Sequence, residues 1–259
     1  MLTLLTLFLA AAAPDAPPPD LPACPSDADA PDVVPLMQRT ERVLEGRSSV
    51  AVMTMGIKTP SYERTIKLKL WSRGRDFALV RVLEGGARET GMMTLKREKQ
   101  LWNYLPQAGR VMKLPSGMMG DSWMGSDFTN DDLVRGSSMA TDFTAVVNKT
   151  IERDGRKAWF VTLTPKPGAK VVWGKVELEL DRATCLPLEQ RFFDEEGALA
   201  RRMTYSDIKQ VGWRSFPMKL TMHPAEKGRS TTMAYESIEL DGEVPEDTFS
   251  LRRLQQGGN

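Results

Sequence analysis

The side chains that could carry out acid–base or nucleophilic chemistry are few in this sequence. His223 is the only histidine, and it stands at the end of a predicted strand with no neighbouring pattern to orient it. Ser122 follows Gly120 and Asp121, but Met124 occupies the position where a nucleophile elbow needs glycine. A secreted hydrolase that uses Ser122 and His223 is therefore only our third hypothesis.

The sequence predicts no metal, no cofactor and no nucleic-acid partner. One histidine and two distant cysteines do not supply the ligands of a zinc site. Asp127, Asn130, Asp131 and Asp132 lack the spacing and central glycine of a calcium loop, so helix capping explains them better. No glycine-rich phosphate loop opens a helix, and the net charge of +1 comes from dispersed residues. We expect a binding protein and no enzyme.

One segment, Ser116 to Arg135, has an unusual composition, and we call it the flap. Residues 116–126 combine glycine, methionine and tryptophan without a period of two or of 3.6, which indicates a mobile apolar loop. Thr129 and Asp132 fit a capping box, so residues 131–135 are predicted to begin a short helix. Exposing such an apolar segment to water is costly. We expect the flap to cover a ligand.

The flap follows a predicted hairpin and lies within a chain of alternating period. The hairpin runs through Trp102 and Tyr104, turns at residues 106–109, and returns through residues 111–114. Elsewhere the alternation of apolar and charged residues is typical of half-exposed antiparallel strands. From turn spacing we expect roughly ten or eleven strands. They are predicted at residues 51–58, 62–71, 77–83, 91–96, 142–151, 159–165, 175–181, 188–193, 201–208, 216–222 and 231–240.

A single helix precedes these strands. Residues 33–44 carry apolar side chains at helical spacing, with Asp32 as the expected N-cap and Gly46 as the stop. So many strands in one domain must stack as two sheets or curl. Large apolar residues on successive strands favour curling, with one face lined by Trp71, Phe77, Leu79, Trp102, Tyr104, Trp159 and Phe160. The predicted fold is mainly β: one strongly curved, incompletely closed antiparallel barrel, with the helix and a short helical lid over its concave face.

The N-terminal region indicates export. Residues 1–13 form a short apolar run that ends in small residues and resembles a secretory signal cut after Ala12, although no basic residue precedes the run. The alternative is a disordered apolar N-terminus. Residues 14–31 are rich in Pro, Ala and Asp, as in a tether. Three states are open for Cys24: a disulfide with Cys185, lipid attachment, or a free thiol.

Several stretches of the sequence together form a recognisable set. They are LWNYLP, GRVMKLP, the pair Met118 and Met119, SWMGSDFTNDDL, and VPEDTFSLRRL near the C-terminus. With these stretches the chain resembles the periplasmic outer-membrane lipoprotein-sorting proteins of the LolA/LolB-like superfamily. The resemblance covers about residues 33–254, and is nearest to a branch associated with large lipid exporters. It implies a half-open sheet around a helical lid, with an acyl-chain cavity between them.

The resemblance implies a non-enzymatic, monomeric periplasmic carrier of lipoprotein or other lipid acyl chains, with an inner-membrane lipid exporter as a further partner. An envelope scaffold that docks on such an exporter is the alternative. The family's carriers hold the lid with an arginine, for which Arg64, Arg81 and Arg110 are candidates here. The expected domain spans residues 32–254, followed by a disordered tail at 255–259. The predicted cavity or lid residues are Trp71, Trp102, Tyr104, Met112, Met118, Met119, Trp123, Met124 and Phe128.

Overall fold

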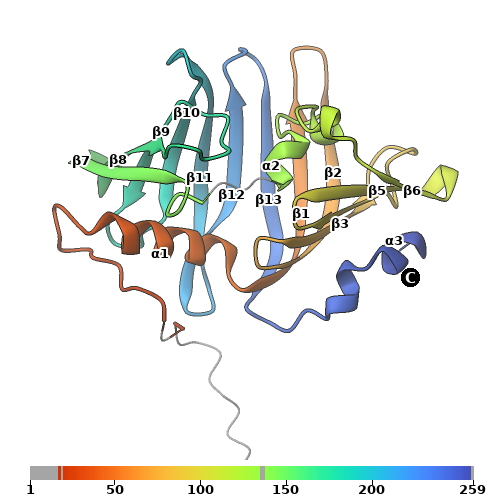
Figure 1. Ribbon diagram of the computed structural model, residues 1–259, viewed down its shortest axis with the longest axis horizontal. Coiled ribbons are helices and arrows are strands. Elements are labelled where there is room, and N and C mark those ends of the chain that lie inside the picture. Colours follow the sequence, from red (N-terminus) through yellow and green to blue (C-terminus); the bar gives the residue numbers. More distant parts are fainter. Residues whose placement is uncertain (1–16, 19, 135–137, 258–259) are drawn as a thin grey trace, which may run out of the picture.

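The alternating segments form thirteen strands of one antiparallel sheet in the part of the chain that the computed structural model describes, residues 17–257 without 19 and 135–137 (Figure 1). The predicted signal at 1–13 lies outside these residues. The strands are β1 (Ser48–Lys58), β2 (Glu63–Arg73), β3 (Phe77–Glu84), β4 (Met93–Arg97), β5 (Gln100–Leu105), β6 (Arg110–Lys113), β7 (Phe143–Arg153), β8 (Arg156–Pro165), β9 (Lys175–Asp181), β10 (Pro187–Phe193), β11 (Leu199–Val211), β12 (Arg214–Pro224) and β13 (Ser230–Leu240).

The predicted fold class is confirmed, but the predicted strand count of ten or eleven is wrong. The predicted hairpin before the flap forms β5 and β6, and these two short strands come in addition to the eleven ranges predicted elsewhere. Helices are short: α1 (Val33–Glu45), α2 (Asn130–Val134), α3 (Leu251–Gln255), and the 3-10 helices η1 (Pro106–Ala108), η2 (Ser116–Met118), η3 (Trp123–Gly125) and η4 (Glu246–Phe249). None of the helices in the described residues is long and apolar enough to span a bilayer.

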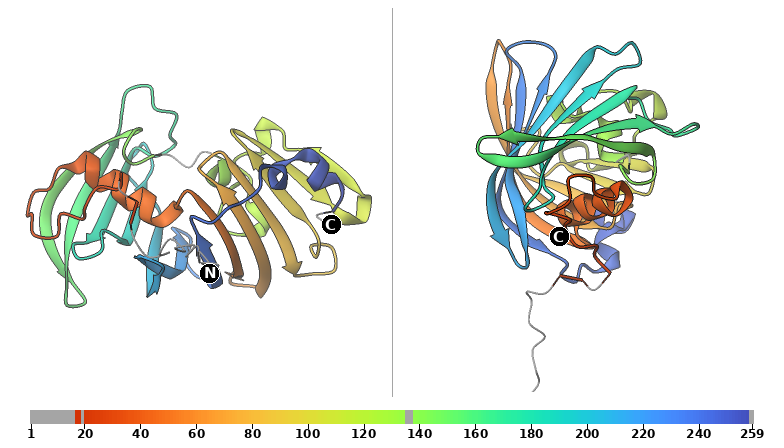
Figure 2. Two further views of the ribbon diagram at one scale, coloured as in Figure 1. Left: turned by 90° about the horizontal axis from the view of Figure 1, so that it is seen from below. Right: turned by 90° about the vertical axis from the view of Figure 1, so that its left-hand side faces the viewer.

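The strand order explains why the flap crosses the sheet. The order is β6-β5-β4-β3-β2-β1-β13-β12-β11-β10-β9-β8-β7, so β1 pairs with β13 at the centre and β6 and β7 form the two free edges. All other connections between sequential strands join neighbours, whereas the link from β6 to β7 must pass from one edge to the other. Figure 2 shows how far the sheet curls. The flap is part of this link.

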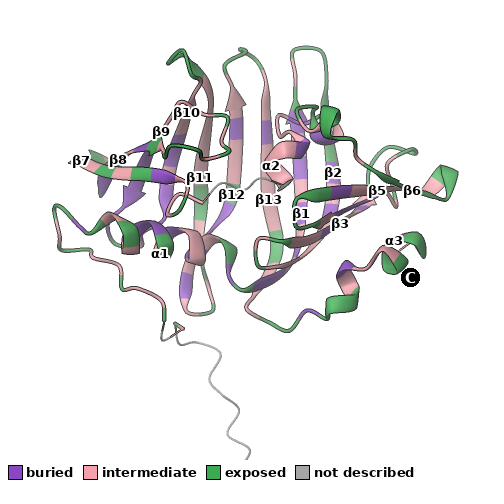
Figure 3. Cartoon of the chain, in the orientation of Figure 1, coloured by how far each residue is buried: buried purple, intermediate pink, exposed green. Residues whose placement is uncertain are grey.

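Helix α1 covers the concave face beside β7 to β10. Asp32 accepts a hydrogen bond from the Val34 amide, and Gly46 ends the helix at a φ of 66°, which favours glycine. Both predicted helix boundaries are thereby confirmed. Leu36 and Met37 lie fully buried against the inner residues of β8 and β9, among them Trp159, Val161, Leu163, Leu178 and Leu180. Burial is concentrated on the strands, as Figure 3 shows.

The opposite, convex face is covered beside β3 to β6 by the C-terminal segment. Phe249 of η4 and Leu254 of α3 are buried against Leu79, Met93 and Leu95. Residues paired directly across antiparallel strands share a face. The pairs Trp71 with Leu79, Leu95 with Trp102, and Met93 with Tyr104 therefore place all three of these aromatic residues on the convex face.

The described part of the predicted tether is attached to the domain. Cys24 forms a disulfide with Cys185, so the sulfur is not available for lipid attachment in this structure. Three further contacts fix the same arm. The Arg39 guanidinium donates to the Pro22 carbonyl at 2.6 Å, the Trp159 indole donates to the Ala28 carbonyl at 3.0 Å, and Arg182 pairs with Asp29 at 2.7 Å. At the other end, α3 runs to Gln255 and residues 258–259 lie outside the described part.

We predict that replacing both cysteines by serine lowers the free energy of unfolding by about 2–4 kcal/mol, because the bridge joins residues 161 apart in sequence and restricts the unfolded chain. Urea unfolding of the oxidised protein and of the double variant measures this difference. Reduced wild-type protein is the matched control and should lose the same amount. A mature protein whose intact mass shows a lipid on Cys24, or two free thiols, would contradict the bridge.

Candidate functional site

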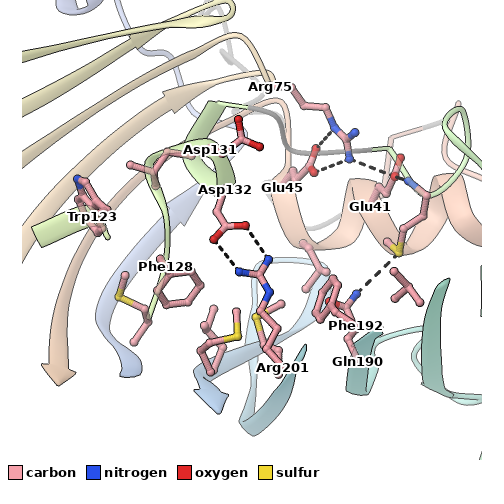
Figure 4. A pocket seen from close by; sticks show the side chains of 18 of the residues that line it. Glu41, Glu45, Arg75, Trp123, Phe128, Asp131, Asp132, Gln190, Phe192 and Arg201 are labelled. Atoms are coloured by element: carbon pink, nitrogen blue, oxygen red, sulfur yellow. Dashed lines mark hydrogen bonds and ion pairs between the residues drawn. The ribbon is translucent and has the colours of Figure 1, made fainter. Parts of the chain in front are cut away.

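An apolar cavity of about 450 Å³ lies between the flap and the concave face of the sheet (Figure 4). Strands from both halves of the sheet, the flap and α1 all contribute residues to its wall. The inner residues of β1 to β3 line one side, those of β11 to β13 line the floor, and α1 closes the far side. The wall residues from the sheet include Met53, Leu68, Leu70, Val80, Met203, Leu220, Met222, Met233 and Tyr235.

The period of two along the strands produces this wall. Leu68 and Leu70 alternate on β2 with Lys67 and Lys69, so the strand buries one side chain in two. The register carries the pattern across the sheet, because Leu68 pairs with Met53. One face of the sheet is thus apolar over many strands. Apolar walls with few polar groups are typical of small-molecule sites.

Flap residues complete the cavity on its open side. Trp123 is only 3% exposed, packs in the cluster that contains Met53 and Leu68, and donates from its indole nitrogen to the Thr94 hydroxyl at 3.3 Å. Phe128 also lines the cavity. The sequence predicts a mobile apolar loop here; the structure shows the 3-10 helices η2 and η3 in this segment, and its largest side chain is buried.

The capping box of the flap also carries an ion pair with the sheet. The Thr129 amide donates to Asp132 at 2.8 Å and the Asp132 amide donates back to the Thr129 hydroxyl at 3.1 Å, which confirms the predicted box. Arg201 of β11 donates both terminal nitrogens to the Asp132 carboxylate, at 2.7 and 2.6 Å. Burial alone would raise the pKa of Asp132, but the guanidinium outweighs it and holds that pKa below its usual value.

Two more arginines hold the flap at its other side. Arg64 of β2 donates to the carbonyl of Met124 and pairs with Glu89 at 2.5 Å. Arg229, just before β13, pairs with Asp127 at 3.0 Å, and the Thr231 hydroxyl donates to the same carboxylate at 2.8 Å. Polar contacts thus fasten a flap that presents the apolar side chains of Trp123, Phe128 and Leu133 to the cavity.

Helix α1 holds the chain where it leaves the flap. Glu41 accepts hydrogen bonds from the Ser138 hydroxyl, at 3.1 Å, and from the Met139 amide. It also pairs with Arg75 at 3.2 Å. Burial of Glu41 raises the pKa of this carboxyl above its usual value, and Arg75 opposes the effect.

Two half-buried tyrosines add polar atoms to the apolar wall. The Tyr205 hydroxyl donates to the Gln190 side chain at 3.0 Å. Burial raises the pKa of Tyr235 to about 12, so this phenol stays neutral at physiological pH. Neither tyrosine adds charge to the cavity. A wider, more polar cavity of about 1190 Å³ adjoins it and shares Glu41, Arg75 and Lys170 with it.

The predicted site residues fall into three groups. Trp123 and Phe128 line the apolar cavity, and Met124 packs beside it. The remaining flap methionines lie outside: Met119 lines the polar cavity, and Met118 is 45% exposed. Four residues from the strands do not line the apolar cavity either, because Met112 is 53% exposed at the sheet edge and the convex face holds Trp71, Trp102 and Tyr104.

Of the three arginine candidates, Arg64 contacts the flap. Arg81 pairs with Met93 in the register and so points to the convex face, and Arg110 is exposed at the start of β6. The sequence analysis missed Arg201. A signal was present, because Arg201, Met203 and Tyr205 alternate on one face, and a charged residue on the apolar face of a strand needs a partner.

Ser122 and His223, the two residues considered for a hydrolase, make contacts within the fold. Ser122 donates its hydroxyl to the Ser126 carbonyl within the flap. His223 pairs with Arg202 across β11 and β12, and burial with Arg202 nearby lowers its pKa. Among the described residues, no three His, Cys, Asp or Glu side chains are grouped closely enough to hold a metal ion.

Comparisons with known proteins place this geometry in a family. A family model described only as an uncharacterized protein matches residues 74–256. The search of curated proteins finds no match. Several solved structures are similar to this chain, and the similarity covers most of both chains.

A DUF1329 family protein from Desulfovibrio piger is 19% identical, with a TM-score of 0.76, over 85% of this chain and 96% of that one. An outer membrane lipoprotein-sorting protein domain from Vibrio parahaemolyticus is 23% identical, with a TM-score of 0.74, over 86% and 97%. A LolA superfamily protein from Nitrosomonas europaea is 18% identical, with a TM-score of 0.67, over 83% and 96%. The chain therefore belongs to this family of uncharacterized proteins, and its fold is that of the LolA-like outer membrane lipoprotein-sorting proteins, as the sequence resemblance predicts.

Proposed function

We propose that this protein is a non-enzymatic periplasmic carrier that takes a lipid acyl chain into the apolar cavity beneath the flap. The observation that carries the proposal is the cavity itself, about 450 Å³ and lined mainly by apolar side chains from both halves of the sheet and from the flap. Pockets of roughly 300–1,000 Å³ hold small ligands in proteins. The cargo is a lipid or a lipoprotein.

The affinity comes from burial and needs no reactive group. Each methylene moved from water into an apolar site contributes about 0.8 kcal/mol, so a chain of about ten methylenes supplies ample driving force. Part of that energy opens the cavity, because the flap has to lift Trp123 and Phe128 away from the wall. Release reverses the exchange, since the flap side chains refill the space.

The polar contacts make this exchange reversible. Arg64 and Arg229 hold the flap by charged hydrogen bonds outside the cavity, and Arg201 holds it from within, while the apolar contacts of Trp123 and Phe128 resemble those that an acyl chain makes. Both states therefore bury similar apolar area and differ by few interactions. A ligand can shift such an equilibrium by its preference for the open state.

Filling the cavity should weaken lipid binding. Met203 and Leu220 are half-buried wall residues, and a tryptophan at either position occupies the space of at least two methylenes, which corresponds to about a tenfold loss of affinity. Titration of the purified variants with a fluorescent fatty acid measures the change. Leu199→Trp is the matched control, because Leu199 is exposed at the start of β11 outside the cavity, and it should bind as the wild type does. Equal affinity in all three variants would place the lipid elsewhere.

Lipid entry should move Trp123 into a more polar environment. Its emission shifts to longer wavelength once the indole leaves the Thr94 hydroxyl and the buried cluster. The shift is obtained as the difference between the wild type and Trp123→Phe, because the chain has six tryptophans. An unchanged difference spectrum at saturating lipid, with binding shown independently, would exclude the flap as the cover.

The envelope scaffold is distinguished by what accompanies the protein. Gentle purification from the envelope followed by native mass spectrometry should show a co-purified lipid. A protein free of lipid that retains a membrane exporter would favour the scaffold instead.

A further inference from the structure

The cavity contains a cation whose carboxylate partner belongs to the flap. Arg201 extends from β11 into the cavity, and its side chain is only 12% exposed. Its guanidinium lies 4.5 Å from the centre of the Trp173 ring and 4.9 Å from that of Phe192. Figure 4 shows the fork of its two terminal nitrogens directed at Asp132.

Among the described residues, Asp132 is the only carboxylate within ion-pair distance of Arg201. The other guanidinium in the cavity wall has partners outside the flap, because Arg75 pairs with Glu45 at 2.6 Å and with Glu41 at 3.2 Å, both on α1. The Nε of Arg201 is buried without a hydrogen-bond partner in the described structure. Loss of the Asp132 contact therefore removes the ion pair of Arg201, whereas the two ion pairs of Arg75 with α1 do not involve the flap.

A neutral lipid leaves this charge uncompensated. When the flap lifts, Asp132 departs with it, and a guanidinium among aromatic side chains loses its only counter-ion. Removing one partner of a buried ion pair is strongly destabilising, because the remaining charge is neither hydrated nor paired. A ligand with its own oxyanion restores the pair. The two terminal nitrogens of an arginine donate to two oxygens of a carboxylate or of a phosphate in the same way.

We propose that Arg201 is the headgroup site of the carrier, that Asp132 occupies this site in the empty state, and that the cargo is an amphiphile with one acyl chain and an oxyanion. The inference rests on the proposed function, since it assigns the ligand class of the same cavity. A carboxylate or phosphate of the ligand takes the place of the Asp132 carboxylate on Arg201. The chain fills the apolar space along Met203 and Tyr205, which share the face of Arg201 on β11.

The test compares ligands that differ only in the head. Laurate, methyl laurate and dodecyl phosphate are titrated into the full chain below their micelle concentrations, with isothermal calorimetry as the measurement. Laurate should bind at least about tenfold more tightly than its methyl ester, because the ester cannot pair with Arg201. Comparing the affinity for dodecyl phosphate with that for laurate then shows whether the site prefers a phosphate or a carboxylate.

Variants locate the effect on Arg201. Arg201→Gln should reduce the ratio of laurate to ester affinity to about one. Arg229→Gln is the matched control: it also releases a flap contact but lies outside the cavity, so the ratio should stay as in the wild type. Asp132→Asn removes the competing carboxylate and should tighten laurate binding by about tenfold or more, a gain that misfolding cannot produce.

Each failure has its own signature. Laurate and its ester binding equally well to the wild type would overturn the headgroup site and leave the carrier function standing. Weaker laurate binding by Asp132→Asn would also overturn it, because Asp132 would then support the ligand site. Absence of binding by all three ligands would contradict the carrier function itself.

Discussion

The structure depends on a sheet that curls without closing. Strands β6 and β7 are its two free edges, and the order of the strands obliges the intervening chain to pass between them. A concave face lined with leucine, methionine and tyrosine cannot remain open to water without cost. The flap and α1 meet this constraint from two sides, and the cavity is the space that they leave unfilled.

Charge decides how the cover is attached. Trp123 and Phe128 of the flap face the apolar wall, and polar attachments add to this packing. These attachments depend on Arg64, Arg201 and Arg229, each from a different strand or its flank. Arg201 differs from the other two because it lies inside the cavity, where the loss of its partner is costly. In the carrier that we propose, the same residue connects flap position with the chemistry of the ligand.

Much of the fold was predictable from local patterns. The period of two gave the strands, and Asp32 with Gly46 gave both ends of α1, because these signals act within a few residues. The capping box of Thr129 and Asp132 is equally local. The hairpin of β5 and β6 was predicted as well, although the expected total of ten or eleven strands left its two short strands out. The motifs that resemble the LolA-like proteins added the lid and its place on the concave face.

The site was less predictable because faces and partners depend on register. From their size, three aromatic residues were predicted to line the cavity: Trp71, Trp102 and Tyr104. Their side chains alternate to the opposite, convex face of the sheet, where the C-terminal segment covers them. Arg201 meets Asp132 across 69 residues of sequence, a contact that no local pattern contains. The disulfide of Cys24 with Cys185 is a similar case, since spacing left the pairing open.

Photo-crosslinking with a fatty acid that carries a diazirine in its chain tests the central claim most directly. The account predicts labelled peptides from the inner faces of β2 and β11 to β13, around Leu68, Met203 and Met233, together with the flap around Trp123. Labelling confined to the convex face around Trp71 and Trp102, with the inner strands unlabelled, would contradict it.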